Sequence, residues 1–485
     1  MSFLEEYFSQ FRRGIVGVDT TYESPYGEQR ITYADWIASG RLYAPIEGKM
    51  LTLFGPMVAN THTESNETGR FMTEAYHCAL GEIKRHVNAG RDDVIVTAGF
   101  GMTSAINKFQ RMLGLKDRGV TFQGTEDRPV VFVTHMEHHS NQTSWYETEA
   151  DVVVVAPDER MLVSPQNLRE TLEQYRDRRV KVGSFTACSN VTGIKTPYHE
   201  LARIMHEHGG VCFVDFAASA PYVDIDMHPE NPLEKLDAVL FSPHKFLGGP
   251  GSSGVLIFDS KLYRFGVPDQ PGGGTVDWTN PWGEYKYIDD IERREDGGTP
   301  GFLQAIRTAL AIRLKDQMGV DSMQRREREL VDLAFDRLSP VPGLHILADS
   351  CRDRIGAISF YIDGIHYNLI VSLLSDRFGV QMRGGCACAG TYGHFLLQVT
   401  PEKSHAITAL INHGDLSLKP GWVRWSIHPT TTNAEVELIA SAVGQIAQNA
   451  VQWGEDYQYD KRTNEFVHRR RSSYRLFDAE QMLSL

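Results

Sequence analysis

Short apolar runs rich in β-branched residues alternate along the middle of the chain with stretches in which apolar residues recur at helical spacing. The short runs are typical of strands that are buried on both faces of a sheet. Helical spacing lies between them at residues 103–113, 164–178 and 197–208. Alternating strands and helices predict an α/β fold with a mostly parallel sheet flanked by helices. We expect seven strands in this sheet, at residues 94–97, 130–134, 152–155, 180–185, 211–215, 238–241 and 254–258.

The pattern changes after residue 300, where a long helical stretch at 301–338 predicts a hinge into a second domain. A strand pattern at 355–362, a helical one at 367–377, a strand at 423–427 and a helix at 434–448 follow. This mixture is typical of a smaller α+β domain. Near the start of the chain, residues 33–39 carry a helical pattern.

These changes of pattern predict four regions. We expect an N-terminal arm at 1–45 that packs on the smaller domain, a large domain at 46–320, a small C-terminal domain at 321–450 and a C-terminal extension at 451–485.

The composition narrows the class of protein. The chain has 485 residues, of which 49 are basic and 62 acidic, so its formal net charge of −13 disfavours nucleic acid and anionic membranes as partners. Hydrophobic residues make up 41% and charged residues 23%, as in soluble globular proteins. Six cysteines are too few for a disulfide scaffold, and no apolar run approaches the length of a membrane span. We therefore expect a cytoplasmic protein.

Lys245 is the leading candidate for a reactive group. It follows an apolar strand pattern and precedes a glycine-rich loop, which is where a parallel sheet delivers groups to its ligand crevice. A lysine in that place can form a Schiff base with an aldehyde cofactor or a carbonyl substrate. Taken alone, a lysine is far more often a solvated surface charge.

Asp215 strengthens this interpretation, because it ends another apolar strand 30 residues upstream. A carboxylate there can keep a pyridinium nitrogen protonated, as pyridoxal phosphate requires. The alternative is a helix-capping or turn aspartate at the strand exit. Asp215 and Lys245 together favour pyridoxal phosphate.

Two further segments follow predicted strands. Gly101, Met102 and Thr103 open a helix, and backbone N–H groups at a helix start can hold a phosphate. His138, in the run His-Met-Glu-His-His, can stack on a flat heteroaromatic ring. We disfavour zinc for this run, because Glu137 separates the histidines at neither metalloprotease spacing and no cysteine pair lies nearby.

With these motifs in this order, residues 53–447 resemble a class V aminotransferase of the fold type I pyridoxal-phosphate enzymes. The resemblance is to the branch that contains cysteine desulfurases and selenocysteine lyases. It implies a homodimer with shared active sites, a large domain with a seven-stranded sheet and a smaller C-terminal domain. The roles that it implies are ring stacking for His138 and Ala217 on opposite faces, contact with the ring hydroxyl side for Asn190, ring-nitrogen protonation for Asp215, phosphate binding for Ser242 and His244, the Schiff base for Lys245, a phosphate contact across the dimer for Thr299, and binding of the substrate carboxylate for Arg424.

A second stretch resembles the desulfurases in particular. Arg383, two glycines and Cys388 occur at the spacing of the desulfurase loop, in which the cysteine attacks the substrate sulfur and becomes a persulfide. A glycine-rich, arginine-flanked loop favours a reactive thiolate. Cys386 lies two residues away, and the alternative is that both cysteines merely pack in a tight turn.

Several features depart from the desulfurase pattern. Ala218 stands where desulfurases carry glutamine, and the phosphate loop contains one hydroxyl residue, Thr103, where they often have two. Residues 278–288 are rich in aromatics and could form either a wall for a bulkier substrate or an interface. Three adjacent arginines within 467–473 could bind an acidic partner, although a solvated or internally paired face fits the acidic chain better.

We therefore expect a pyridoxal-phosphate enzyme that acts on an amino acid, with desulfurase-like C–S cleavage slightly favoured and a sulfur-acceptor protein as partner. Lys245 would move the Cα proton, and Arg383, Asn190 and Arg424 would contact the substrate. The alternatives are an aminotransferase or an epimerase or lyase for a bulkier amino acid. An alternative of another class is a non-catalytic cofactor-binding or sulfur-relay scaffold.

Overall fold

The computed structural model describes residues 2–61, 63–117, 119, 122, 124–470 and 482–484. The chain divides into two compact units. The larger unit comprises Ser39–Ser189 and Lys195–Val320, and the smaller comprises Met1–Ala38, Asn190–Ile194 and Asp321–Leu485. The division into four regions at residues 45, 320 and 450 stays a prediction.

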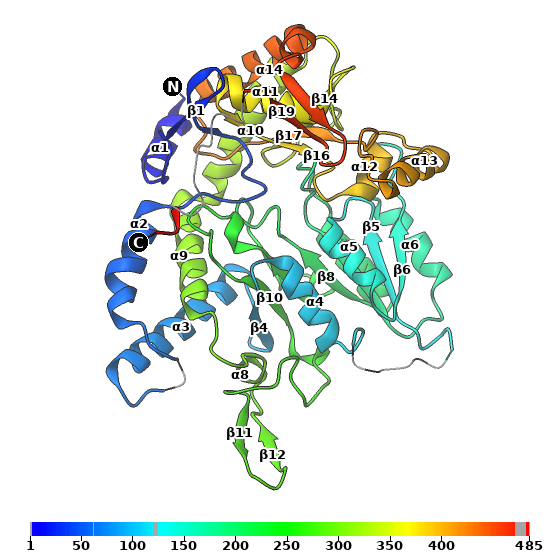
Figure 1. The fold of residues 1–485 in the computed structure, drawn as a ribbon. Helices are drawn as coiled ribbons and strands as arrows, with labels where there is room; N and C mark the ends of the chain where they lie inside the picture. Colours follow the sequence, from blue (N-terminus) through cyan, green and yellow to red (C-terminus); the bar gives the residue numbers. More distant parts are fainter. Residues whose placement is uncertain are drawn as a thin grey trace. The chain divides into compact units, whose positions relative to one another are not determined.

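The larger unit contains a seven-stranded sheet with the strand order β4-β10-β9-β8-β7-β5-β6 (Figure 1). Its strands are β4 (Asp93–Ala98), β5 (Val130–Thr134), β6 (Asp151–Val155), β7 (Lys181–Thr186), β8 (Val211–Asp215), β9 (Ala238–Phe241) and β10 (Gly254–Asp259). All neighbouring strands are parallel except β10, which is antiparallel to both β4 and β9. The predicted mostly parallel seven-stranded sheet is therefore confirmed.

Helices cover this sheet because their apolar stripes need a partner surface. The helices are α2 (Ala44–Lys49), α3 (Glu67–His86), α4 (Met102–Met112), α5 (His139–Tyr146), α6 (Pro165–Gln174), α7 (Tyr198–Glu207), α8 (Ile291–Glu295) and α9 (Phe302–Met318). Ile106 and Phe109 of α4 pack with Val131 and Phe213 of the sheet in one buried cluster. A β-hairpin formed by β11 (Val276–Thr279) and β12 (Tyr285–Tyr287) projects from the unit (Figure 1).

The smaller unit is built on a four-stranded antiparallel sheet with the order β13-β14-β17-β16. These strands are β13 (Leu344–Ile346), β14 (Ala357–Ile362), β16 (Arg383–Gly385) and β17 (Trp422–Ser426). The helices of the unit are α1 (Phe3–Arg12), α10 (Val320–Leu338), α11 (Tyr367–Phe378), α12 (Gly390–Leu396), α13 (Pro401–Asn412) and α14 (Asn433–Gly454). Leu330, Phe360, Leu374, Trp425 and Ile439 belong to its core.

Three small pairings complete this unit. The hairpin of β1 (Thr21–Ser24) and β2 (Gly27–Arg30) lies near the N-terminus, and that of β18 (Tyr457–Asp460) and β19 (Glu465–His468) follows α14. The short strands β3 (Thr32–Tyr33) and β15 (Val380–Gln381) pair in parallel. Of the arginine-rich stretch at 467–473, residues 471–473 lie outside the described residues, and Arg469 bonds within the chain to Glu455 O at 3.0 Å.

Two of the predicted helices are wrong. Residues 33–39 are not helical, because the Ala34 N–H donates to Gln381 O at 3.0 Å and Ala34 O accepts from the Ser426 N–H at 2.8 Å, which requires an extended chain. The stretch 301–338 is two helices, α9 and α10, rather than one. Gly319 separates them with a φ of +74°, in the left-handed region that glycine tolerates best.

Candidate active site

Asp215 and Lys245 come from neighbouring parallel strands of the larger unit. Asp215 is the last residue of β8, and its register partner on β9 is Leu240. One residue after Phe241 ends β9, a single 3₁₀ turn at Pro243–Lys245 carries Lys245 to a half-buried position. The carboxyl ends of adjacent parallel strands form the ligand edge of such sheets, so the topology brings the two predicted residues to the same edge.

The Asp215 carboxyl is only 4% exposed. Its Oδ1 accepts a hydrogen bond from the Ala217 N–H at 2.8 Å. Burial raises the pKa of Asp215 to about 6, although the Ala217 bond and the charge of Lys245 act in the opposite direction. A buried carboxylate with an elevated pKa gains most from a cationic partner, and a protonated pyridine nitrogen is such a partner.

The start of α4 lies against the Lys245 segment. The Met102 N–H donates to Ser242 Oγ at 2.9 Å, and the helix N-cap Gly101 supplies no side-chain cap. A Cβ at Gly101 would lie 3.1 Å from Ser242 Oγ and 3.6 Å from His244 Nε2, so the glycine leaves this space open. Burial, and secondarily the charge of Lys245, lowers the pKa of His244 to about 4, which keeps its imidazole neutral.

His138 is the N-cap residue of α5, and its Nδ1 accepts from the Ser140 N–H at 3.1 Å. The neutral ring therefore carries its proton on Nε2. Ser140 Oγ lies 2.6 Å from Thr103 Oγ1, so the His138 segment is linked to the first turn of α4. His138, Thr103, Met102 and Ser242 thus belong to one connected set of groups.

Glu137, next to His138 in the chain, holds the local structure together through hydrogen bonds. Its carboxylate accepts from Thr134 Oγ1 at 2.7 Å, the Thr186 N–H at 2.9 Å and Asn141 Nδ2 at 2.8 Å. Burial raises its pKa to about 7. Among the residues that the structure describes, no group of three His, Cys, Asp or Glu side chains could hold a metal ion.

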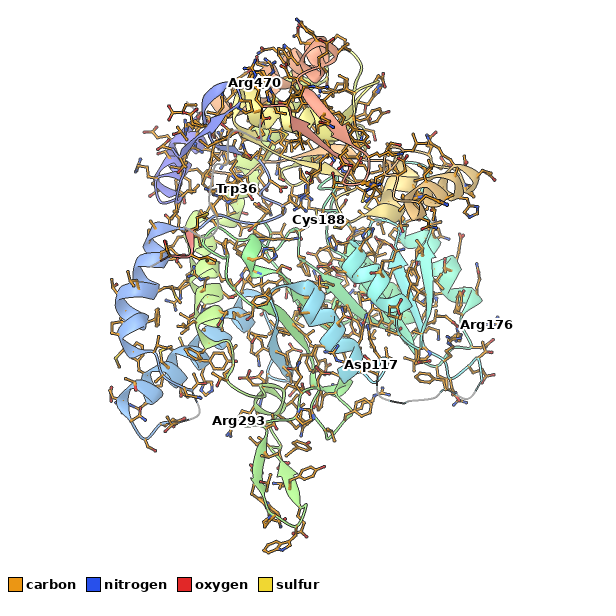
Figure 2. All side chains as sticks on the ribbon, viewed as in Figure 1. Trp36, Asp117, Arg176, Cys188, Arg293 and Arg470 are labelled. Carbon is orange, nitrogen blue, oxygen red and sulfur yellow. The ribbon has the colours of Figure 1, made fainter. Side chains whose placement is uncertain are left out.

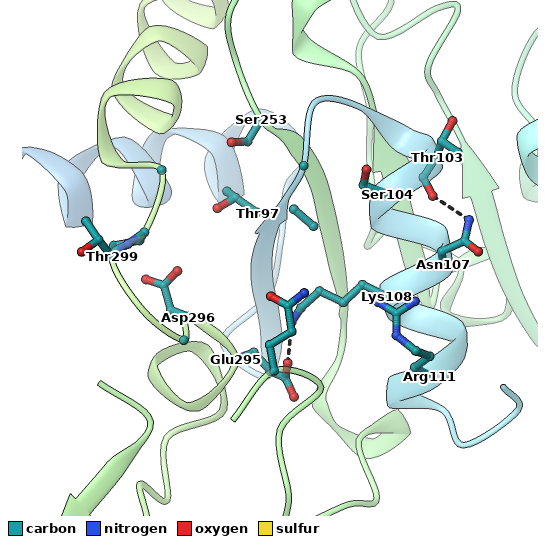
Figure 3. Close-up of a pocket in the computed structure, with 16 residues that line it drawn as sticks. Thr97, Thr103, Ser104, Asn107, Lys108, Arg111, Ser253, Glu295, Asp296 and Thr299 are labelled. Atoms are coloured by element: carbon teal, nitrogen blue, oxygen red, sulfur yellow. Dashed lines mark hydrogen bonds and ion pairs between the residues drawn. The ribbon is translucent and has the colours of Figure 1, made fainter. Parts of the chain in front are cut away.

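A polar pocket of about 510 Å³ lies beside α4 (Figure 3). Thr103, Ser104 and Thr299 line it, and Asn60 Nδ2 donates to Thr299 Oγ1 at 3.3 Å. Lys108 Nζ, on the same helix, pairs with Glu295 at 2.7 Å at one end of the pocket. The predicted site residue Thr299 therefore shares a pocket with Thr103 of its own chain, and its contact with a partner subunit stays a prediction.

In the smaller unit, the two predicted arginines are register partners on β16 and β17. Arg424 Nη2 donates to Asp35 Oδ1 at 2.7 Å, and Arg383 Nε lies 3.5 Å from Asp35 Oδ2. Arg424 is 2% exposed, and burial lowers its pKa while Asp35 raises it. Next to Asp35, Trp36 (labelled in Figure 2) stacks on His428, with ring centroids 4.2 Å apart.

Cys388 lies in a left-handed turn. The Ala389 N–H donates to Cys386 O at 3.1 Å, and the two central residues, Ala387 and Cys388, have φ angles of +51° and +57°. This is the geometry of a type I′ turn, which usually contains Asn or Gly and costs other residues about 1 kcal/mol or more each. The Cys388 side chain is exposed and Cys386 is half-buried.

Asn190 braces the same turn. Its Nδ2 donates to Ala387 O at 2.7 Å, its backbone oxygen accepts from Arg424 Nη1 at 3.2 Å, and its buried Oδ1 has no hydrogen-bond partner among the described residues. The structure thus connects Asn190, Arg424, Arg383 and Cys388 within the smaller unit. The predicted contact of Asn190 with a cofactor ring stays a prediction, as do the roles of Ala217 and His138 on the ring faces.

Sequence reasoning missed Asp35 and Ser140. Nothing in the pattern pointed to Asp35, since its partner Arg424 is 389 residues away along the chain. Ser140 carried a signal, because it follows His138 at a predicted strand exit, where Ser and His often cap helices.

The family described as Aminotransferase class-V matches residues 32–439. A probable cysteine desulfurase of Halalkalibacterium halodurans is 29% identical over 339 residues, which is 68% of this chain and 77% of that protein. A probable cysteine desulfurase of Staphylococcus aureus is 28% identical over 362 residues, covering 74% of this chain and 84% of that protein.

Solved structures confirm the expected fold type I architecture. The cysteine desulfurase of Thermococcus onnurineus matches with a TM-score of 0.71 at 19% identity, over 91% of this chain and 98% of the other. The cysteine desulfurase CsdA of Escherichia coli matches with a TM-score of 0.70 at 22% identity, over 91% and 98%. Among the described residues, no helix is long and apolar enough to cross a membrane. The match over most of its length shows that the chain is an enzyme of the class-V aminotransferase family, whose members depend on pyridoxal phosphate.

Proposed function

We propose that this enzyme removes sulfur from cysteine or a closely related amino acid and holds it on Cys388. The observation that carries the proposal is the turn at Cys386–Ala389, which presents an exposed thiol in a strained conformation. Backbone strain persists where the surrounding structure fixes it and clusters at functional sites. The desulfurase relatives support the same activity.

The residues of the larger unit fit pyridoxal phosphate. Gly101, Met102, Ser242 and His244 bring a helix N-terminus, a hydroxyl and an imidazole together, groups that can bind a phosphate, and Asp215 is a buried carboxylate suited to a ring nitrogen. When bound, this cofactor supplies an aldehyde for the amine of the substrate and a ring that withdraws electrons from Cα. Because Ser242 Oγ already accepts from the Met102 N–H, its own hydrogen can be donated to a phosphate oxygen.

Lys245 would hold the cofactor through its amine and would move a proton at Cα of the substrate. Asp215 would pair with the ring nitrogen and keep it protonated. The neutral His244 would donate a hydrogen bond to the phosphate, and His138, oriented by Ser140, would stack on the ring.

The smaller unit receives the carboxylate and the sulfur. Arg383 and Arg424 carry two positive charges against the single negative charge of Asp35, which leaves one charge for a substrate carboxylate. Cys388 attacks as a thiolate: its sulfur bonds to the sulfur of the substrate, the Cβ–S bond breaks, and the electron pair goes to the substrate carbon, which takes up a proton. Cysteine becomes alanine, and the sulfur remains on Cys388 until an acceptor protein takes it.

One observation favours a second candidate, a transaminase or an epimerase or lyase for a bulkier amino acid. Ala218, where desulfurases have glutamine, is 6% exposed, so its methyl group offers a cofactor no hydrogen bond. A non-catalytic scaffold is disfavoured, because Lys245, Asp215 and Arg424 are all retained.

We further propose a homodimer in the cytoplasm. Trp282 and Tyr285 of the β11–β12 hairpin are 84% and 58% exposed, and exposed aromatics of this kind are typical of interfaces. None of the six cysteines, all of which lie in described residues, forms a disulfide, as expected of a reducing compartment.

The experiment is to incubate the protein, loaded with pyridoxal phosphate, with a panel of amino acids and to measure sulfide and keto acid. The proposal predicts sulfide from cysteine in the presence of a reductant, without stoichiometric keto acid. Keto acid formation from other amino acids, with no sulfide from cysteine, would contradict the proposed desulfurase activity and favour transaminase activity. Lys245→Ala is the control, and it should lose the visible absorbance of the attached cofactor.

A further inference from the structure

The hairpin β18–β19 follows α14, beyond residue 439, at which the family match ends. It is fixed to the smaller unit by polar contacts and by Tyr457 and Phe466, which pack with the core of that unit. Tyr457 OH donates to Asp376 at 3.0 Å, and Ser372 Oγ donates to Phe466 O at 3.1 Å. Asp376 and Ser372 both belong to α11, so the hairpin lies along that helix.

Asn464, in the loop of the hairpin, makes several further polar contacts with α11. It is 6% exposed and has a φ of +63°, a conformation that Asn adopts more readily than most residues. Its Nδ2 donates to Tyr367 OH at 2.6 Å, and its backbone oxygen accepts from Asn368 Nδ2 at 2.6 Å. Its Oδ1 accepts from Tyr459 OH at 2.8 Å and lies 3.2 Å from His366 Nε2.

The residues that Asn464 holds form the N-terminus of α11, and this end of the helix packs on β16. A Cβ on Gly384 would lie 2.2 Å from Asn368 Oδ1 and 3.2 Å from Tyr367 Cδ2. The backbone of β16 therefore rests directly on the two side chains that the hairpin fixes. Tyr367 OH also donates to Lys419 O at 3.1 Å, which ties the same ring to the segment before β17.

β16 leads without interruption into the turn at Cys386–Ala389. Its first residue is Arg383, and the turn begins directly after Gly385. The strained φ angles of Ala387 and Cys388 require a turn whose ends are held in place. One end is held by β16 and the other by α12, which starts at Gly390.

We propose that the C-terminal hairpin is a positioning element for Cys388, and that Asn464 is its positioning residue, acting through Tyr367, Asn368 and β16. This inference rests on the proposed role of Cys388 as sulfur acceptor. Asn464 contacts α11 and its own hairpin. It keeps the turn in the conformation that presents the thiol.

Asn464→Gly tests the inference, because glycine keeps the φ of +63° and the backbone oxygen but removes the side-chain bonds to Tyr367 and Tyr459. Lys461→Ala is the matched control in the same loop, since Lys461 is 62% exposed and pairs only with Asp415 among the salt-bridge partners described. Tyr367→Phe removes the same bond from the other side and keeps the ring on Gly384.

The first readout is amide hydrogen exchange of the protein before any turnover. Asn464→Gly and Tyr367→Phe should each speed exchange of the Ala389 N–H, which closes the turn, by about tenfold, and Lys461→Ala should not. Exchange in β13 and β14 should stay as in the wild type. Unchanged exchange at Ala389 in both variants would overturn the inference, whatever the enzyme turns out to do.

The second readout is kinetic. Sulfide formation from cysteine should lose about tenfold in kcat in Asn464→Gly, with KM and the rate of Cα hydrogen exchange unchanged. A parallel loss of both rates would indicate a merely structural role and would contradict the inference. Absence of sulfide from the wild type would instead contradict the proposed function, and the amide exchange would still decide the role of Asn464.

Discussion

Asp35 Oδ1 accepts a 2.7 Å hydrogen bond from Arg424 Nη2 in the smaller unit. The pair joins the segment after β3 to β17, and the Asp35 carboxylate also faces Arg383. The guanidinium expected to bind the substrate carboxylate is therefore already paired with a carboxylate of the chain. On the proposed function a substrate would share or displace this partner, so we expect Asp35 to affect the strength of substrate binding.

Asp35→Asn should lower the KM for cysteine by about tenfold, because the amide keeps the size and one acceptor while it removes the competing charge. Cysteamine, which lacks a carboxylate, is the control substrate, and its KM should not change. A higher KM for cysteine would show that Asp35 orients Arg424 for the substrate instead of competing with it.

Ala387→Gly should raise the free energy of unfolding by about 0.5–1 kcal/mol, because glycine adopts the φ of +51° without the strain of a Cβ. The same change should lower kcat for sulfide formation, since a relaxed turn holds Cys388 less firmly. Chemical denaturation beside a sulfide assay measures both effects, and a destabilised Ala387→Gly would refute the claim of strain.

Burial of Lys315 makes the stability of the larger unit depend on pH. It is 3% exposed, its Nζ donates to Ala220 O at 2.8 Å and to Val223 O, and burial lowers its pKa to about 7. The unfolded chain, with a lysine pKa of about 10.4, binds more protons than the folded chain between these values, so stability rises with pH there.

Relative to Lys315→Met, the wild type should gain about 2 kcal/mol of stability between pH 7 and pH 9. Urea denaturation of both proteins at several pH values measures this difference, in which the titration of other groups cancels. A difference that stays constant over this range would mean that Lys315 keeps an ordinary pKa.

Asp215→Asn should raise the stability of the cofactor-free protein but slow the reaction of the cofactor-loaded enzyme. Since burial raises the pKa of Asp215 to about 6, the cofactor-free wild type carries an unfavourable buried charge above that pH. The asparagine variant without cofactor should therefore be more stable at pH 7.5, by about 2 kcal/mol, and the gain should vanish as the pH falls from 6 toward 4.

With cofactor bound, the same variant should exchange the Cα hydrogen about 100-fold more slowly, because the ring nitrogen loses its anionic partner. Deuterium uptake by the substrate measures this rate. Exchange near the wild-type rate would remove Asp215 from the mechanism.

The strands of the larger unit could be predicted because each is a short apolar β-branched run between polar segments. The break at Gly319 escaped prediction, since apolar spacing continues across it and only the backbone shows the left-handed φ. Residues 33–39 have helical spacing, but hydrogen bonds to Gln381 and Ser426, far along the chain, hold Ala34 extended. Local pattern carries no information on such distant partners.

Part of the candidate site could also be predicted from the sequence, and part could not. The placement of Asp215 and Lys245 could be predicted because Asp215 ends one strand and Lys245 follows the next, and adjacent parallel strands end at one edge. The bracing of Cys388 by Asn190 and the pairing of Arg424 with Asp35 depend on contacts across about 200 and 390 residues, for which no spacing exists in the sequence.

The most direct test of the account is the mass of the peptide that contains Cys388 after incubation of the cofactor-loaded enzyme with cysteine. The account predicts one added sulfur atom on Cys388, lost on reduction, and none on the peptide of the exposed Cys78. In Cys388→Ser, sulfide formation should stop while Cα exchange continues, and Cys386→Ser should keep the added sulfur. No added sulfur on Cys388 while keto acid accumulates would contradict the account.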